Sequence, residues 1–173
     1  ILRHGDTHDI DMVLDLGLAG YEATYKIQKE LVRGRKLGEV DDSLIVLEHP
    51  AVFTMGRTGR LENLLASEDD LAKDDIKVLR VDRGGDITFH GPGQIVLYPI
   101  IDLRRRERDL HRYLRNLEDV VIKFLKLYSV QGRRLDGKTG VWVGGEKIAF
   151  IGIAASDWIT YHGVSVNVNV DLR

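Results

Sequence analysis

Residues 83–94 read Arg83-Gly84-Gly85-Asp86-Ile87-Thr88-Phe89-His90-Gly91-Pro92-Gly93-Gln94. This segment joins two apolar runs, Lys77–Val81 and Ile95–Ile101, which we predict to be strands. Four of its twelve residues are glycine. Glycine permits positive φ angles and close approach of the backbone, which a tight turn needs and a bound substrate can also exploit.

Two interpretations of this glycine-rich segment remain open. For an arbitrary sequence, a β-turn that only connects two strands is the commoner one. Here Arg83, Thr88, His90 and Gln94 stand among the glycines, which favours a site. His90 can donate a hydrogen bond or act as an acid or base near neutral pH, although a single histidine is more often structural.

Outward from this segment, strand and helix patterns alternate along the chain. The N-terminal half contains a predicted strand, a predicted helix that ends near Gly34 and Gly38, and two short extended runs separated by Glu48-His49-Pro50. The two runs form either two strands or one bent strand. The ranges are Met12–Leu16 for the strand, Tyr21–Arg35 for the helix, and Leu44–Leu47 and Ala51–Met55 for the runs.

The C-terminal half has the clearest helix, over Glu107–Tyr128, whose apolar stripe predicts packing on one side of a sheet. Val141–Val143, Gly144-Gly145 and Glu146–Ile153 predict a β-hairpin with a two-residue glycine turn. Thr160–Asp171 alternates between valines and small polar residues, so we expect one face in the core and one face available to line a site.

These patterns indicate an α/β or α+β fold in one domain over residues 1–173. The chain has 25 Lys and Arg against 27 Asp and Glu, a net charge of −2, which favours neither nucleic acid nor an anionic membrane as a partner. No apolar run is long enough for a membrane span, and the start lacks the pattern of a signal peptide. We therefore expect a cytoplasmic protein, or a mitochondrial matrix protein in a eukaryote.

The chain contains no cysteine. This excludes disulfides, thiolate metal sites and a thiol nucleophile within these residues. The glycine spacing matches neither the phosphate-binding loop nor the dinucleotide fingerprint, so neither ATP nor NAD is indicated as a cofactor. We expect no metal site: His90 and His162 have no third ligand at a recognisable spacing, and His4 and His8 lie near the N-terminus.

Three further features are candidates. Lys147 precedes the apolar run Ile148–Ile153, so partial desolvation would fit it for proton transfer, although an exposed lysine beside a turn is the commoner case. Tyr161–Asn167 offers His162 and small residues on one face, or simply a core strand. Arg104–Arg108, with Arg112 and Arg115, forms a basic patch that is either a solvated face or a place where an acidic carrier protein docks.

Taken together, five segments resemble the lipoyl(octanoyl) transferase family. They are Arg83–Gln94, Gly140–Val143, Lys147–Gly152, His162–Asn169, and the pair Glu48-His49-Pro50 with Thr54–Arg57. The resemblance implies the biotin/lipoate protein ligase-like fold, a mixed β-sheet flanked by helices. It implies transfer of octanoyl from an octanoyl-acyl carrier protein to a lysine of lipoyl-domain proteins, such as 2-oxoacid dehydrogenase E2 subunits and the glycine cleavage H protein.

The resemblance also implies the site residues. Lys147 is the implied catalytic residue, because in the family the matching lysine lowers the pKa of a cysteine nucleophile and assists proton transfer. The implied acyl-binding residues are Arg83, Gly84, Gly85, Asp86, Ile87, Thr88, Phe89, His90, Phe150, Ile151, Gly152, Gly163, Val164 and Ser165.

One feature of the family is missing here. Its cysteine stands in a Pro-Cys-Gly context just after the strand that ends Asp-Leu, and here the match ends at Asp171-Leu172. We expect the nucleophile beyond Arg173. An ATP-dependent lipoate ligase on the same fold and a non-catalytic module that binds acyl groups or lipoyl domains are the alternatives.

Overall fold

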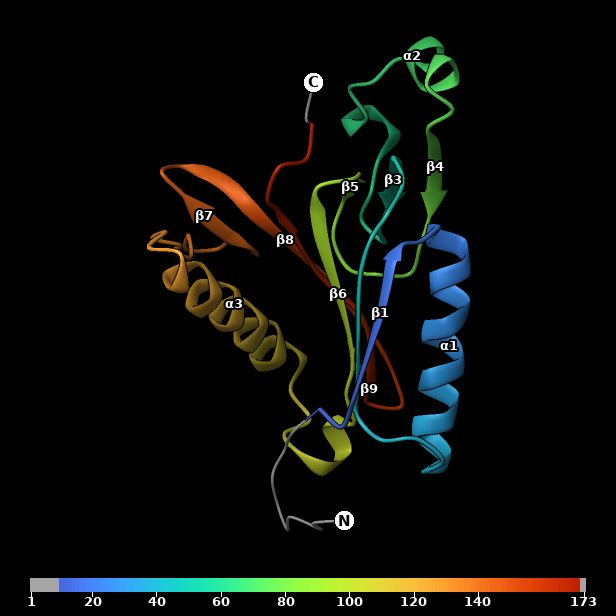
Figure 1. Ribbon diagram of the computed structural model, residues 1–173, viewed down its shortest axis with the longest axis vertical. Helices are drawn as coiled ribbons and strands as arrows, with labels where there is room; N and C mark the ends of the chain where they lie inside the picture. The colour runs from blue at the N-terminus through green and yellow to red at the C-terminus, as the bar shows by residue number, and fades with distance from the viewer. Residues whose placement is uncertain (1–9, 172–173) are drawn as a thin grey trace.

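The computed structural model describes residues 10–171 and contains two β-sheets (Figure 1). The larger sheet has six strands in the order β1-β2-β6-β9-β8-β7, and the smaller has three in the order β4-β3-β5. Pairing is parallel between β1 and β2 and between β3 and β4, and antiparallel between the other neighbours. The predicted fold class, with a mixed sheet, is therefore confirmed.

The strands are β1 (Met12–Leu18), β2 (Ser43–Glu48), β3 (Val52–Met55), β4 (Lys77–Arg80), β5 (Ile87–His90), β6 (Gln94–Ile100), β7 (Val141–Val143), β8 (Glu146–Ser156) and β9 (Ile159–Asn167). The helices are α1 (Tyr21–Leu37), α2 (Glu68–Lys73) and α3 (Leu110–Leu127), with 3-10 turns η1 (Leu61–Asn63) and η2 (Leu103–Arg105).

Helices α1 and α3 cover opposite faces of the six-stranded sheet (Figure 1). Because side chains alternate along a strand, β2 and β6 present Ile45, Leu47, Val96 and Tyr98 to the α1 side, where they form one buried cluster. On the other face α3 packs on β7, β8 and β9. That core comprises Tyr113, Leu117, Val121 and Leu125 of α3 with Val141, Ala149, Ile151, Val164 and Val166 of the strands.

Most predicted elements are present, and the hairpin β7–β8 is confirmed with its turn at Gly144-Gly145. The two runs around His49-Pro50 are separate strands, β2 and β3, which belong to different sheets. Strand β5, which lies inside the glycine-rich segment, was not predicted. One sheet was therefore expected, whereas the structure has two.

Several predicted boundaries were wrong, and three of them have a clear local reason. Helix α1 continues through Gly34, whose missing side chain leaves room for Val40, and ends at Gly38 with φ of 74°. Helix α3 begins at Leu110 rather than Glu107, because Asp109 caps it. Strand β9 ends at Asn167, since the next backbone N–H groups turn to the carbonyl oxygen of Gly93.

Candidate functional site

A narrow cavity of about 30 Å³ lies where β5 and Arg83 face strands β6, β8 and β9 of the larger sheet. Its lining residues are Tyr21, Arg83, Thr88, His90, Val96, Tyr98, Phe150, Ile151, Gly152, His162, Gly163, Val164 and Ser165. The glycine-rich segment, strand β8 and strand β9 therefore meet at one place, although they are separate in the sequence. Because the space is so small, an acyl chain can enter only if side chains that line it move.

Nine of the predicted acyl-binding residues line this cavity, and five do not. The alternation of side chains along β5 explains in part why some predicted residues line the cavity and others do not. Thr88 and His90 point to the cavity, whereas Phe89 points away and packs on Phe53, with ring centroids 5.1 Å apart. The five outside the lining are Gly84, Gly85, Asp86, Ile87 and Phe89.

Asp86 has a clear structural role. Its carboxylate accepts hydrogen bonds from the backbone N–H of Arg60, at 3.2 Å, and from the side chain of Asn63, at 2.5 Å. These bonds and the Arg60 charge lower the pKa of Asp86. The residue thus fixes the loop after β3 and does not face the cavity.

Arg83 is buried and its guanidinium bonds mainly to backbone. It donates to the carbonyl oxygens of Thr54 at 2.7 Å, Gly84 at 2.9 Å and Asp86 at 2.9 Å, and also to the Thr54 hydroxyl. Burial lowers the pKa of Arg83. The side chain therefore fastens its own loop to β3 while it forms part of the cavity wall.

His90 is held as a neutral ring. Its Nδ1 lies 2.7 Å from Oε1 of Gln94, which can only accept, so Nδ1 carries the proton. Its Nε2 lies 3.3 Å from the Thr54 hydroxyl. Burial lowers the pKa of His90 to about 3. The interpretation of His90 as an acid or base near neutral pH is therefore not supported by its surroundings.

Tyr21, Val96, Tyr98 and His162 line the cavity but were not among the predicted residues. His162 Nε2 lies 2.7 Å from a carboxylate oxygen of Asp82, and its Nδ1 lies 3.3 Å from the Tyr21 hydroxyl. Burial lowers the pKa of His162, partly offset by Asp82. Of this set the sequence singled out only His162, as a candidate in Tyr161–Asn167, because Tyr21, Val96 and Tyr98 come from elements that look like ordinary core.

The glycines of the cavity make room for protein rather than for a ligand. A Cβ atom on Gly163 would overlap the carbonyl oxygen of Leu97 on the neighbouring strand. A Cβ atom on Gly152 would come within 2.8 Å of the Gly84 carbonyl oxygen and 2.9 Å of the Arg83 side chain. Both positions therefore require glycine for backbone packing.

Lys147 lies outside this lining, at the start of β8, and is half-buried. Its Nζ atom lies 4.7 Å from the ring centre of Phe150, which lines the cavity, and 5.3 Å from that of Trp142. Within residues 10–171 this ammonium forms neither a hydrogen bond nor an ion pair. Burial lowers the pKa of Lys147.

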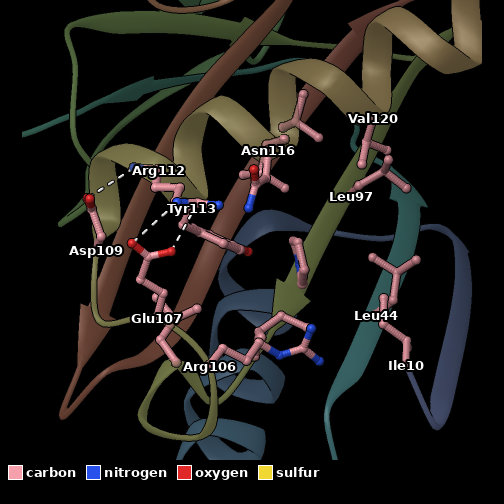
Figure 2. Close-up of a pocket in the computed structure, with 15 residues that line it drawn as sticks. Ile10, Leu44, Leu97, Arg106, Glu107, Asp109, Arg112, Tyr113, Asn116 and Val120 are labelled. Atoms are coloured by element: carbon pink, nitrogen blue, oxygen red, sulfur yellow. Dashed lines mark hydrogen bonds and ion pairs between the residues drawn. The ribbon is translucent and has the colours of Figure 1, made fainter. Parts of the chain in front are cut away.

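A larger cavity, of about 320 Å³, lies on the other face of the sheet between α3 and strands β2 and β6 (Figure 2). Its wall includes Leu44, Leu97 and Val120, and its rim includes Arg112, whose guanidinium pairs with Glu107 at 3.0 Å. Of the predicted site residues only Val164 reaches it. The other predicted residues that line a cavity gather at the narrow one.

Much of the predicted basic patch is neutralised. Arg104 pairs with Asp102, Arg106 with Asp42, Arg112 with Glu107, and Arg115 with Glu118. In the described part of the chain, no group of three or more His, Cys, Asp or Glu side chains could hold a metal ion. His4 and His8, which the sequence analysis did not favour as metal ligands, lie outside the described residues.

The family described as the lipoyl protein ligase A/B catalytic domain matches residues 20–173. An octanoyltransferase of Rubrobacter xylanophilus is 52% identical over 158 residues, which cover 90% of this chain and 71% of that protein. One of Solibacter usitatus is 48% identical over 157 residues, 91% of this chain and 71% of that protein. A chloroplastic octanoyltransferase of Arabidopsis thaliana is 48% identical over 90% of this chain and 56% of its own length.

Among solved structures, a lipoate-protein ligase A bound with ATP aligns with a TM-score of 0.80 and 17% identity, over 95% of this chain and 69% of that one. At this identity the likeness concerns the fold alone. The predicted biotin/lipoate ligase-like fold is therefore confirmed. No helix among residues 10–171 is both long and apolar enough to cross a membrane.

Proposed function

The chain belongs to the lipoyl protein ligase A/B catalytic domain family, and from this premise we propose how its residues carry out the reaction. The reaction is octanoyl transfer in lipoate biosynthesis, the activity for which its relatives are named. We propose that residues 1–173 belong to one ligase-like domain. The donor is an octanoyl-acyl carrier protein, and the acceptor is a lysine of a lipoyl domain.

The proposed acyl site is the narrow cavity below β5, with the residues that line it. The octanoyl tail lies against Thr88, His90 and Phe150, where apolar surface is combined with a neutral imidazole. The other residues that the family resemblance implies, Gly84, Gly85, Asp86, Ile87 and Phe89, support the loop and strand that form this wall. The cavity is narrow, so we expect the Phe150 ring to move when the chain enters.

The proposed catalytic residue is Lys147, and one observation supports it above all. A half-buried ammonium beside two aromatic rings, with no anion or acceptor bonded to it among the described residues, is costly to maintain. Such a group is suited to receive an anion that arrives with the substrate. In acyl transfer from a thioester, that anion is a thiolate.

In the final transfer, each bond that forms is matched by one that breaks. The neutral amine of the acceptor lysine attacks the thioester carbon, the C–N bond forms and the C–S bond breaks. The sulfur leaves as a thiolate, which the Lys147 ammonium stabilises, and the proton lost by the amine returns to sulfur. These 173 residues contain no cysteine, so the thiol in this step lies outside them.

Replacement of Lys147 by alanine in the intact gene product tests the proposal. We expect octanoyl transfer to fall by about 10³-fold, as on loss of a group that stabilises charge in a transition state, while the melting temperature changes little. Intact mass spectrometry of a lipoyl domain, with octanoyl-carrier protein as donor and no ATP, measures the transfer. Lys123→Ala, at an exposed lysine of α3, is the control. Equal activity of Lys147→Ala and Lys123→Ala would remove Lys147 from the mechanism.

We also propose acceptor proteins and a cellular compartment for the reaction. Lipoyl domains of 2-oxoacid dehydrogenase E2 subunits and the glycine cleavage H protein are the acceptors that we favour. We place the reaction in the cytoplasm, or in the mitochondrial matrix in a eukaryote. The relative from Arabidopsis thaliana is chloroplastic, so organellar versions of the family exist.

A further inference from the structure

We infer that Glu118 of α3, acting through the backbone of Gly140, is the positioning residue for Lys147. The inference rests on the proposed function, because it assigns a purpose to where the Lys147 side chain lies. It concerns residues outside the cavity lining that no sequence pattern had connected with the lysine. Figure 1 shows α3 beside the β7–β8 hairpin, whose strand β8 contains Lys147.

Glu118 is a fully buried carboxylate with three partners. Oε1 accepts a hydrogen bond from the backbone N–H of Gly140 at 2.9 Å. Oε2 accepts from Arg115 at 2.8 Å and from Arg134 at 2.7 Å. Both arginines are partly exposed, whereas the Glu118 side chain is 0% exposed. The carboxylate is therefore fixed in place, and the bond that reaches inward goes to Gly140.

Gly140 in turn determines where the Lys147 stem can lie. It has φ of 131°, and a Cβ atom here would overlap Cε of Lys147 and approach the Ala149 carbonyl oxygen at 2.6 Å. The lysine stem thus lies directly on the Gly140 backbone. The stem is held from one side by Gly140, and the Nζ atom lies 4.7 Å from the ring centre of Phe150, a residue that lines the cavity.

The charges around Lys147 give Glu118 a second effect. The charged groups that act on its ammonium are Glu118 from α3, Arg83 from the loop before β5, and Lys138 from the loop before β7. The two cations and burial lower the pKa of Lys147, and Glu118 is the group that raises it. Without this carboxylate the lysine would lose its proton at a lower pH.

A pair of glycine variants in the intact gene product tests the positioning step. Gly140→Ala places a methyl group on the Lys147 stem, and Gly145→Ala is its control, since Gly145 has φ of 125° but no atom within 4 Å of its Cβ position. The two positions have similar φ angles, but the methyl group of Gly140→Ala also lies 2.6 Å from the Ala149 carbonyl oxygen, so its result is read together with that of Glu118→Asp. We expect kcat of Gly140→Ala to be about 100-fold below that of Gly145→Ala, the order of loss for a displacement of about 1 Å, with little change in KM.

Two substitutions of Glu118 separate the effect of its side-chain length from the effect of its charge. Glu118→Asp keeps the charge but withdraws it from Gly140, so kcat should fall while the pH profile keeps its position. Glu118→Gln removes the charge, so the Lys147 titration, followed by NMR of its ε-carbon, should move to lower pH. Should Gly140→Ala fail to fold, this second pair carries the test alone.

The outcomes distinguish this inference from the proposed function. An inactive Lys147→Ala together with equal kcat for Gly140→Ala and Gly145→Ala, or with an unmoved Lys147 titration in Glu118→Gln, overturns the inference alone. Full activity of Lys147→Ala overturns both. A loss in Gly140→Ala and Glu118→Asp that exceeds the loss in Gly145→Ala supports the chain of contacts from Glu118 to the lysine.

Discussion

At the scale of single residues, three buried histidines gather around one tyrosine at the candidate site. The rings of His49 and His90 lie 5.1 and 6.1 Å from that of Tyr21, and His162 Nδ1 lies 3.3 Å from the Tyr21 hydroxyl. Burial lowers the pKa of all three histidines. The sequence identified His90 and His162 as candidates, but it could not reveal that the fold encloses them as neutral rings.

These histidines predict how stability depends on pH. Their folded pKa values lie below the unfolded value of about 6.5, so the unfolded chain binds more protons and stability is lost as pH falls below about 6.5. For His90 the loss continues down to its folded pKa of about 3. Well between these two values His90 contributes a slope that approaches about 1.4 kcal/mol per pH unit.

Urea unfolding between pH 7.5 and pH 5 measures that slope. His90→Gln should reduce it by up to about 1.4 kcal/mol per pH unit at the acid end of this range, since one proton-binding difference is removed. A His90→Gln slope equal to that of the parent chain would mean that the imidazole is not kept neutral by burial.

At the scale of elements, helix α3 shows what the sequence pattern could and could not predict. Its apolar spacing identified the helix, and Leu117, Val121 and Leu125 are buried as expected. The pattern extended the start to Glu107, because charged residues there fit the polar face. The true start depends on a cap, a local hydrogen bond to which hydrophobic spacing is blind. Val120, 55% exposed, lies on the wall of the larger cavity instead of in the core.

The cap gives the prediction for this element. Asp109 accepts hydrogen bonds from the backbone N–H groups of His111 at 2.8 Å and Arg112 at 3.0 Å. Asp109→Ala should lower the free energy of unfolding by about 1 kcal/mol, the usual cost of removing a cap. Asp109→Asn, which keeps the acceptor oxygen, should retain most of the stability. Equal losses in the two variants, measured by urea denaturation, would show that the hydrogen bonds do not stabilise the helix start.

At the scale of the whole molecule, the candidate site exists because a loop from the smaller sheet crosses the larger one. The N–H of Gly84 donates to the carbonyl oxygen of Ile153 at 2.9 Å, and the Gly84 carbonyl group and the Arg83 side chain lie on Gly152 of β8. The glycine-rich segment was predicted to form a wall of the site, and Arg83 at its start together with Thr88 and His90 of β5 line the cavity. The sequence could not predict that its middle, β5, pairs with β3, because such pairing joins residues far apart in the chain.

This crossing predicts opposite behaviour for two glycines of the proposed site. A Cβ atom on Gly152 would lie 2.8 Å from the Gly84 carbonyl oxygen, which is backbone and cannot move away without shifting the loop. The same atom on Gly84 would lie 3.6 Å from the Ile153 carbonyl oxygen, an ordinary contact. We therefore expect Gly152→Ala to lower the free energy of unfolding by about 1–3 kcal/mol, as overpacking does, and Gly84→Ala to change it by less than about 0.5 kcal/mol.

Urea unfolding of both variants, with octanoyl transfer measured in parallel, checks this. Gly152→Ala should lose stability and activity together, since the methyl group lifts the Arg83–Gly84 loop from β8 and the cavity lies beneath that loop. Gly84→Ala should keep both. If Gly152→Ala were fully stable yet inactive, the glycine would serve the acyl chain directly, and the close approach of the two backbones would not be the reason for its presence.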